Sequence, residues 1–253
     1  MHCCNKVSGD ARLTNTSLNT KVKSCKFLYS RNKFEDSSLP EICMVGRSNA
    51  GKSSLINMLA RQKNLAKSSS SPGRTRLINY FELNLQVDET NDNLVDDIGI
   101  VKLSDRCENE LEQQHKRVDL SGSASNATKL LLVDLPGYGF SVASKSQREI
   151  WDGLIDTYLT QSSNLKMCFL LIDSRHSPMA NDLHAAQYLY SLNVPFSIIG
   201  AKVDKLSKRQ ANQCVDTIAN GFKVGRDNIA ITSAITGQGR QALLDKIYLV
   251  CKD

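Results

Sequence analysis

Continuous apolar runs alternate with amphipathic segments along most of the chain from residue 41 onward. The apolar runs are short and end at Gly, Asp or small polar residues, as buried strands do. The amphipathic segments repeat apolar residues at the spacing of one helix face. Strands are expected at 41–46, 77–85, 129–134, 167–173, 195–200 and 228–232, and helices at 52–61, 144–159, 178–192, 207–219 and 240–250. This alternation predicts an α/β fold with a mostly parallel six-stranded sheet and helices on both faces.

Two stretches lack this pattern. Residues 86–128 are rich in Asp, Asn, Ser and Glu and cannot build a core, so we expect an acidic insertion that is either disordered or functional. Residues 1–34 are basic and rich in Ser, Thr and Asn, a composition shared by organellar transit peptides and by plain disordered tails. The folded domain is therefore predicted to span 35–253, preceded by an extension over 1–34.

The net charge of +6 is unevenly distributed. Residues 87–114 hold nine acidic and two basic side chains, a net −7, so the rest of the chain carries +13. This surplus is compatible with an RNA-rich partner. No apolar run reaches about 18 residues, so no membrane span is expected.

The chain contains eight cysteines and no C-x-x-C pair. This favours free thiols in a reducing compartment over a metal site or a disulfide framework. The expected location is intracellular: a mitochondrion or plastid if residues 1–34 are a transit peptide, and the cytoplasm otherwise.

The clearest chemical motif runs from Gly46 to Ser53 and fits G-x-x-x-x-G-K-[ST] between an expected strand and an expected helix. Its glycines let the backbone fold around phosphate, with N–H groups pointing inward at the positive end of the helix. Lys52 is expected to reach the β- and γ-phosphates, and the Ser53 hydroxyl to ligate Mg²⁺. The motif predicts a P-loop NTPase.

Three later motifs, in the expected order, favour GTP over ATP. Asp134 to Gly137 (DLPG) follows a buried strand, where the Asp can hold the magnesium shell through water and the Gly N–H can meet the γ-phosphate. Asp204, in Lys202-Val-Asp, can accept the N1–H and N2–H₂ of guanine, a pair that adenine cannot offer. Residues 232–234 (TSA) end the last strand and can offer an N–H to the guanine O6.

Two further positions bear on this site. GTPases carry Asn or Thr before the Lys of the base-binding motif, but this chain has Ala201, which removes a hydrogen bond of about 1 kcal/mol. The loop Ser71-Pro-Gly-Arg-Thr75 lies between the first expected helix and the second strand. Thr75 could ligate Mg²⁺ while the γ-phosphate is present and release it after hydrolysis, which would make the loop a switch.

The segments GRSNAGKSSLIN, SPGRTRLINYF, DLPGYGF, LIDSRHSP and KVDKLSK, and the helix containing residues 148–151, resemble the signatures of the EngB family, also called YihA or YsxC. This family lies in the TrmE-Era-EngA-EngB-septin-like class of P-loop GTPases. The resemblance covers most of residues 26–250 apart from the insertion. It implies a single Ras-like GTPase domain, GTP and GDP as ligands, Mg²⁺ as cofactor and a role in large ribosomal subunit assembly; family descriptions also mention septum formation and cell division.

The resemblance also implies residue roles. Lys52, Thr75, Gly137 and Asn49 would be the catalytic residues, and Ser53, Thr75 and Asp134 would hold Mg²⁺. The expected nucleotide contacts are Gly46, Arg47, Ser48, Asn49, Ala50, Gly51, Lys52, Ser53, Ser54, Gly73, Arg74, Thr75, Asp134, Leu135, Pro136, Gly137, Ala201, Lys202, Val203, Asp204, Thr232, Ser233 and Ala234. The partner would be the large ribosomal subunit or its rRNA, with no membrane, and the chain is expected to be a monomer.

Hydrolysis is expected to be slow, because Tyr138 stands where Ras-like proteins have a water-positioning Gln. Asn49 is a candidate for holding K⁺, which would replace an arginine finger, or it simply shapes the loop. Candidates for rRNA contact are Arg74, Arg76, Arg148 and Arg175; a solvated face is the more usual explanation for any single arginine, and the +13 balance outside the insertion adds weight to RNA contact by the four together. Two alternatives stay open: a nucleotide-gated interaction module with negligible hydrolysis, and a division or septation factor.

Overall fold

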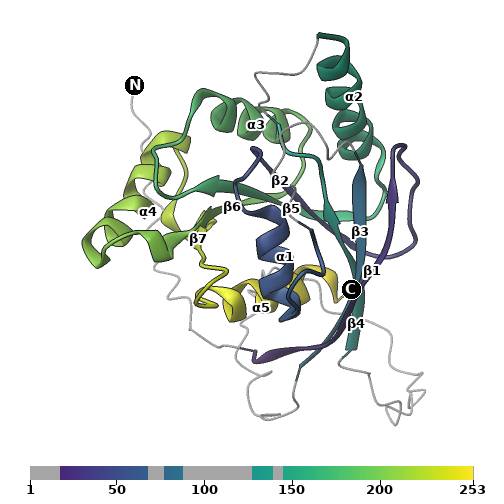
Figure 1. Ribbon diagram of the computed structural model, residues 1–253, viewed down its shortest axis with the longest axis horizontal. Coiled ribbons are helices and arrows are strands. Elements are labelled where there is room, and N and C mark those ends of the chain that lie inside the picture. Colours follow the sequence, from purple (N-terminus) through teal and green to yellow (C-terminus); the bar gives the residue numbers. More distant parts are fainter. Residues whose placement is uncertain (1–17, 68–76, 88–126, 139–144, 253) are drawn as a thin grey trace, which may run out of the picture.

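A computed structural model describes residues 18–67, 77–87, 127–138 and 145–252. Within these ranges the chain forms one seven-stranded sheet in the order β1-β3-β4-β2-β5-β6-β7 (Figure 1). The strands are β1 (Thr20–Arg31), β2 (Glu41–Gly46), β3 (Ile78–Val87), β4 (Ala127–Asp134), β5 (Leu165–Asp173), β6 (Phe196–Ala201) and β7 (Ile229–Ile231). The helices are α1 (Lys52–Ala60), α2 (Lys145–Gln161), α3 (Ala180–Ser191), α4 (Lys208–Phe222) and α5 (Arg240–Cys251), with short 3₁₀ turns η1 (Val203–Lys205) and η2 (Arg226–Asn228).

The sheet is mostly parallel, as expected. Strand β2 pairs in parallel with β4 and β5, and β5, β6 and β7 continue in the same sense. Only β1 and β3 introduce antiparallel pairs, at one side of the sheet. The carboxyl ends of the five parallel strands therefore meet at one edge, which is where α/β proteins of this kind bind ligands.

The seventh strand corrects the expected domain organisation. Strand β1 lies inside the segment 1–34 that was assigned to an extension, yet its register with β3 runs from Thr20↔Val87 to Arg31↔Ile78. Three of the five lysines in this segment, Lys21, Lys23 and Lys26, belong to an edge strand, where charged side chains discourage pairing with other molecules. The sheet therefore has seven strands rather than six, and the folded domain begins by Thr20 rather than at residue 35.

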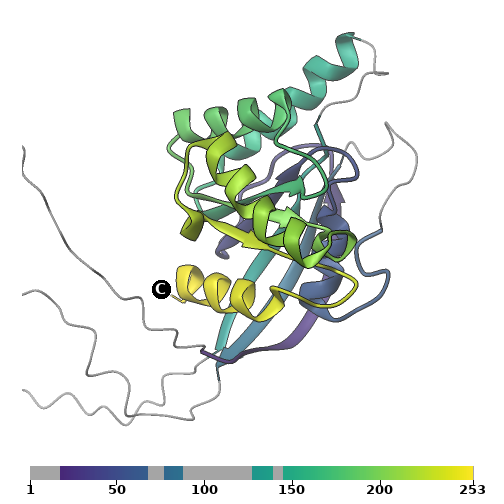
Figure 2. The same ribbon diagram turned by 90° about the vertical axis from the view of Figure 1, so that its left-hand side faces the viewer.

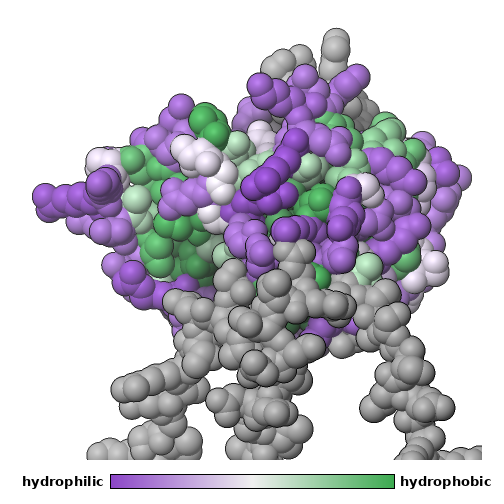
Figure 3. Space-filling view, turned by 90° about the horizontal axis from the view of Figure 1, so that it is seen from below, coloured by the Kyte–Doolittle hydropathy of each residue, from purple (hydrophilic) through white to green (hydrophobic). Residues whose placement is uncertain are grey.

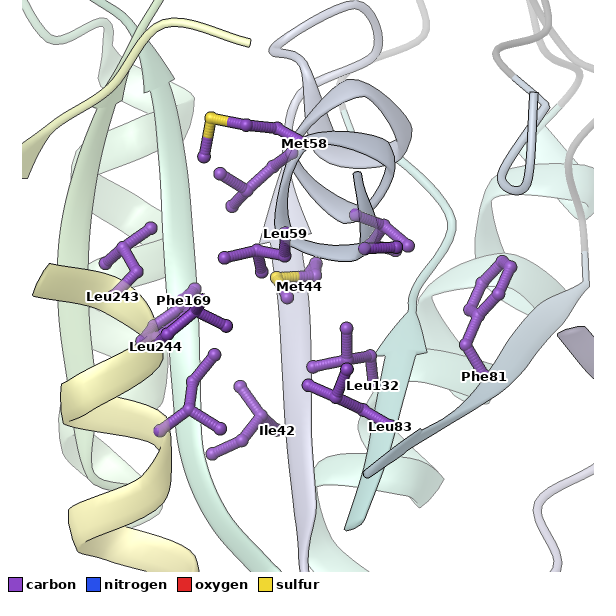
Figure 4. Close-up of a cluster of buried hydrophobic side chains, with 14 of the residues drawn as sticks. Ile42, Met44, Met58, Leu59, Phe81, Leu83, Leu132, Phe169, Leu243 and Leu244 are labelled. Carbon is purple, nitrogen blue, oxygen red and sulfur yellow. The ribbon is translucent and has the colours of Figure 1, made fainter. Parts of the chain in front are cut away.

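Helices cover both faces of the sheet (Figures 1 and 2). On one face, α1 and α5 bury Leu59 and Leu244 against Ile42 and Phe169 of the central strands (Figure 4). On the other face, α2 and α3 bury Tyr158 and Leu189, and α4 adds a smaller cluster beside them. The face seen from below mixes hydrophilic side chains with smaller apolar patches (Figure 3).

Most predicted boundaries agree with the structure to within a few residues. The helix expected from residue 178 begins at Ala180, with Met179 as its N-cap. Strands β3 and β4 extend to Val87 and from Ala127, so only residues 88–126 of the expected insertion lie outside the described part of the chain. Ser207 caps α4, accepting a hydrogen bond from the Gln210 amide at 3.3 Å.

Arg240 joins α5 to the helix that begins at the candidate site. Its Nε donates to the carbonyls of Met58 and Leu59 at 2.9 and 3.1 Å, and a second guanidinium nitrogen donates to Leu59 at 2.6 Å. The Leu59 carbonyl lies in the last turn of α1, where the helix leaves carbonyls without partners, whereas Met58 O also accepts the Arg61 N–H at 3.2 Å. A cation at this end also complements the helix dipole.

No helix in the described ranges combines the length and the apolar character that crossing a bilayer requires.

Candidate functional site

The loop from the end of β2 to the start of α1 has the geometry of a phosphate cradle. Gly51, the N-cap of α1, has φ of 114°, a conformation that side-chain-bearing residues rarely adopt. Asn49 is also left-handed, with φ of 64°. The first turn of α1 contains no acidic residue, so its positive end is not neutralised from within the helix. The loop therefore presents backbone N–H groups and a helix N-terminus to an anion.

Lys52 places a buried cation in this loop. Its side chain points back over the loop, where Nζ donates to the carbonyls of Gly46 at 3.0 Å and Arg47 at 3.4 Å. The residue is only 8% exposed. Burial lowers the pKa of Lys52, and the nearby Asp134 carboxylate opposes that shift. An ammonium stripped of water in this way is ready to bind phosphate oxygens.

Ser53 and Asp134 form the expected metal pair. The Ser53 hydroxyl donates to Asp134 Oδ2 at 2.9 Å, which joins the first turn of α1 to the end of β4. Asp134 Oδ1 is buried and has no hydrogen-bond partner among the described residues. Burial raises the pKa of Asp134, while Lys52 and Ser53 oppose the shift. A buried carboxylate oxygen without a partner, next to a hydroxyl, fits the oxygen-only environment that Mg²⁺ and its water shell prefer.

Gly137 lies directly against the phosphate loop. A Cβ at this position would be 2.8 Å from the Ser48 amide nitrogen and 2.9 Å from Lys52 Nζ, so only glycine fits. The next residue, Tyr138, donates its N–H to Gly46 O and accepts the Ser48 N–H, both at 3.3 Å. The Gly137–Tyr138 segment is thus closed over the atoms expected to meet the γ-phosphate.

The side chain of Tyr138 is anchored to α3, a contact that the sequence did not predict. Its hydroxyl donates to Asp182 Oδ1 at 3.1 Å, and Arg47 Nε lies 3.3 Å from the same oxygen. Asp182 Oδ2 accepts the Met179 N–H at 3.0 Å. Asp182 is 2% exposed, so one buried carboxylate connects the phosphate loop, the segment after Gly137 and helix α3.

On the base side, Asp204 is held as an ionised acceptor. Ser233 donates its hydroxyl to Asp204 Oδ1 at 2.7 Å, and Lys205 lies 3.4 Å from Oδ2. The Ser233 hydrogen bond, with Lys205, lowers the pKa of Asp204 despite some desolvation. The Val203 N–H donates to Thr232 O at 3.1 Å, so the two base-binding segments lie side by side. This arrangement suits a base that offers two neighbouring donors, as guanine does.

The remaining expected residues divide into two groups. Leu135, Pro136, Ser54 and Ala234 lie at or beside the site on the elements predicted for them. The residues expected from the switch loop, Gly73, Arg74 and Thr75, lie outside the described residues, as does Arg76.

Two of the arginines expected to contact rRNA, Arg148 and Arg175, lie in the described chain. For Arg148 only the helical backbone is described. Arg175 pairs with Asp173 through two side-chain hydrogen bonds of 2.9 and 2.7 Å rather than standing free, although its side chain is 46% exposed.

Five cysteines fall within the described chain, and all five are buried and free: Cys25, Cys43, Cys168, Cys214 and Cys251.

Comparisons with known proteins identify the family. The family model described as 50S ribosome-binding GTPase matches residues 41–202. A "Probable GTP-binding protein EngB" from Cytophaga hutchinsonii is 36% identical over 233 residues, covering 88% of this chain and 94% of that protein. The protein of the same name from Caldanaerobacter subterraneus subsp. tengcongensis is 31% identical over 227 residues, covering 88% and 95%.

A solved structure agrees at the level of the fold. The crystal structure of a probable GTP-binding protein engB aligns with a TM-score of 0.54 at 21% identity, covering 84% of this chain and 98% of that one. Sequence relatives, fold and site geometry agree, and the chain belongs to the EngB family of GTP-binding proteins and is a P-loop GTPase.

Proposed function

We propose that this GTPase acts as a nucleotide-dependent switch in assembly of the large ribosomal subunit. The main support is the matching family model, whose description is 50S ribosome-binding GTPase. The charge distribution adds to it, because the chain outside residues 87–114 carries +13 and would be attracted to RNA phosphates.

The arrangement of the described residues supports nucleotide binding at this site. The loop amides and Lys52 take the phosphates, and Asp204 accepts two hydrogen bonds from guanine. Ser53 and Asp134 are the residues that would hold Mg²⁺, which neutralises charge on the β- and γ-phosphates when bound.

The Gly137–Tyr138 segment supplies the response that a switch needs. The Ser48 amide is hydrogen-bonded to Tyr138 O, and Gly137 lies close to Lys52 Nζ. A γ-phosphate that meets both Lys52 Nζ and the Gly137 N–H has to move this segment. Because Tyr138 is bonded to Asp182, the movement would reach α3, whose Tyr190 is 78% exposed and available to a partner.

Hydrolysis by the isolated chain is expected to be slow. Tyr138 takes the place of a water-positioning Gln, and its hydroxyl is occupied by Asp182. The activation barrier for GTP hydrolysis is therefore high in the isolated chain, and a ribosomal partner or a cation would lower it. We propose K⁺ at Asn49, whose side chain is exposed beside the loop. The left-handed φ of 64° is a competing explanation, because Asn adopts that conformation more readily than most residues.

A leader removed on import into an organelle would have to end before Thr20, because β1 belongs to the sheet. Four of the seven basic residues in 1–34 lie in this strand: Lys21, Lys23, Lys26 and Arg31. The compositional argument for a transit peptide therefore rests on a shorter segment, residues 1–19.

Co-sedimentation with purified large ribosomal subunits tests the proposal. The chain should pellet with the subunits in the presence of a non-hydrolysable GTP analogue, and much less with GDP or without nucleotide. Raising the salt from 50 to 200 mM should weaken the interaction severalfold or more, as expected for contacts to RNA phosphates.

The variant Asp204→Asn provides the matched control. It leaves the surface nearly unchanged but removes the acceptor for guanine, so pelleting should no longer depend on added GTP analogue. Equal pelleting in all nucleotide states, or binding that is insensitive to salt, would contradict the proposed function while leaving GTP binding intact.

A further inference from the structure

The base-binding motif lacks the side chain that should connect it to the phosphate loop. Ala201 is the last residue of β6 and is 6% exposed. Its Cβ lies 3.6 Å from the position that a Cβ would take on Gly51. An Asn or Thr at 201 would therefore reach the loop with a polar atom, whereas the Ala methyl group forms no hydrogen bond.

Lys202 makes a connection from the neighbouring position. Its Nζ donates to the Asn49 carbonyl of the phosphate loop at 2.5 Å and to Asp173 Oδ2 at 2.9 Å. One ammonium thus joins the phosphate loop to the end of β5. Its side chain is 29% exposed, so a free lysine here could adopt many other rotamers, and holding it in this one carries an entropic cost.

Asp173 is built to hold that lysine. It is the last residue of β5, it is the parallel partner of Ala201 on β6, and it is 8% exposed. The Arg175 guanidinium and the Arg175 N–H donate to the carboxylate at 2.7, 2.9 and 3.1 Å. Burial would raise the pKa of Asp173, but hydrogen bonds from Arg175 and Lys202 outweigh it and hold the pKa well below its usual range.

We infer that Asp173 is a positioning residue for guanine-nucleotide binding, which fixes Lys202 against the phosphate loop and so replaces the tether missing at Ala201. The Asn49 carbonyl points outward to Lys202. The N–H of the same peptide plane, which belongs to Ala50, then points into the loop, where it meets Arg47 O at 3.0 Å. Asp173 therefore sets both the amide direction in the cradle and the path of the Lys202 stem beside the base. The inference concerns nucleotide binding alone and does not depend on a ribosomal role.

The rate of GDP release tests this assignment, measured by stopped-flow displacement of a fluorescent GDP from the full chain. Asp173→Asn keeps the shape of the side chain but removes the charge that attracts Lys202. We expect GDP to leave about tenfold faster, the effect of losing a hydrogen bond between charged groups. The matched control is Glu82→Gln, which removes a carboxylate held by Lys26 and Lys129 on the same sheet, away from the site. Its release rate should stay within about twofold of the wild type, as for a change without a contact in the site.

Rescue separates positioning from a general structural role. Ala201→Asn introduced into Asp173→Asn should return the release rate to within about threefold of the wild type, because the restored amide supplies the same tether. The same Ala201→Asn change in the wild-type chain should slow release by a smaller factor than it does in Asp173→Asn, because Lys202 already supplies a tether there.

An unchanged release rate in Asp173→Asn, or a faster rate that Ala201→Asn fails to restore, overturns the inference. If Asp173→Asn does not yield folded protein, Ala201→Asn alone decides. If Ala201→Asn slows GDP release by less than about threefold, Asp173 and Lys202 already supply the tether. If it slows release about tenfold, no such tether exists.

Discussion

Removing one hydroxyl group from Tyr138 should shift the balance between GTP and GDP. Tyr138→Phe deletes the donor that lies 3.1 Å from Asp182 Oδ1 and leaves the ring in place. Asp182 keeps its contact with Arg47 and its hydrogen bond from Met179. A hydrogen bond to an ionised acceptor contributes about 1.5–3 kcal/mol, and we take the lower end, about 1.5 kcal/mol, because the carboxylate is not left alone.

The effect should appear mainly with the triphosphate. The Gly137–Tyr138 segment is closed on the Ser48 amide and lies close to Lys52 Nζ, so it competes with the γ-phosphate but not with GDP. Loosening the anchor by about 1.5 kcal/mol should tighten binding of a non-hydrolysable GTP analogue about tenfold relative to GDP.

Competition against a fluorescent nucleotide measures the affinities for the GTP analogue and for GDP on the same preparation, and so gives their ratio directly. Tyr188→Phe is the control, because Tyr188 also lies on α3 and also donates to an aspartate, Asp156, away from the site. The reasoning is refuted if the Tyr138→Phe ratio stays within about twofold of the control, or if GTP analogue and GDP tighten together.

Three further predictions concern stability, cations and pH. Arg240→Met should lower the free energy of unfolding in urea by about 2 kcal/mol, because it uncaps α1, whereas the exposed Arg209→Met should change it by less than about 0.5 kcal/mol. GTP turnover should be faster in K⁺ than in Na⁺ if Asn49 ligates the cation, and equal rates would leave Asn49 with a loop-shaping role only. The preference for GDP over ADP, followed by calorimetry, should stay level as the pH falls from 7 to about 5, because the pKa of Asp204 is already lowered and titration of the phosphates or of Asp134 affects both nucleotides alike. It should fall only below the usual Asp pKa of about 3.9, as the carboxylate becomes protonated, and a decline near pH 6 would show that the base acceptor is another group.

The sequence predicted the phosphate and base motifs because their chemistry requires particular residues at fixed positions after strands. Lys52, Ser53, Asp134 and Asp204 all lie where the order of motifs placed them. The sheet was predictable for a related reason, since strands buried on both faces are continuously apolar.

The parts that were missed depend on tertiary contacts. Strand β1 is edge-located and lysine-rich, so neither periodicity nor composition distinguished it from a tail. In the sequence, Asp173 is an ordinary residue at a strand end and Asp182 an ordinary residue in the first turn of a helix. Their roles arise only when folding brings Asp182 to Tyr138, 44 residues away, and Asp173 to Lys202, 29 residues away.

The contact between β1 and α5 has a consequence for synthesis. The Thr20 N–H donates to Asp245 at 3.0 Å and Gln241 donates to Thr20 O at 3.0 Å, so the first strand of the domain is held by its last helix. On a translating ribosome, β1 can pair with β3 as soon as residues 78–87 have emerged, but the N–H and C=O of Thr20 lack these partners until Gln241 and Asp245 leave the exit tunnel. The start of β1 is therefore fixed only after α5 has emerged, and in nascent chains stalled before residue 240 the Thr20 end of β1 should exchange its amide hydrogen faster than in the complete domain.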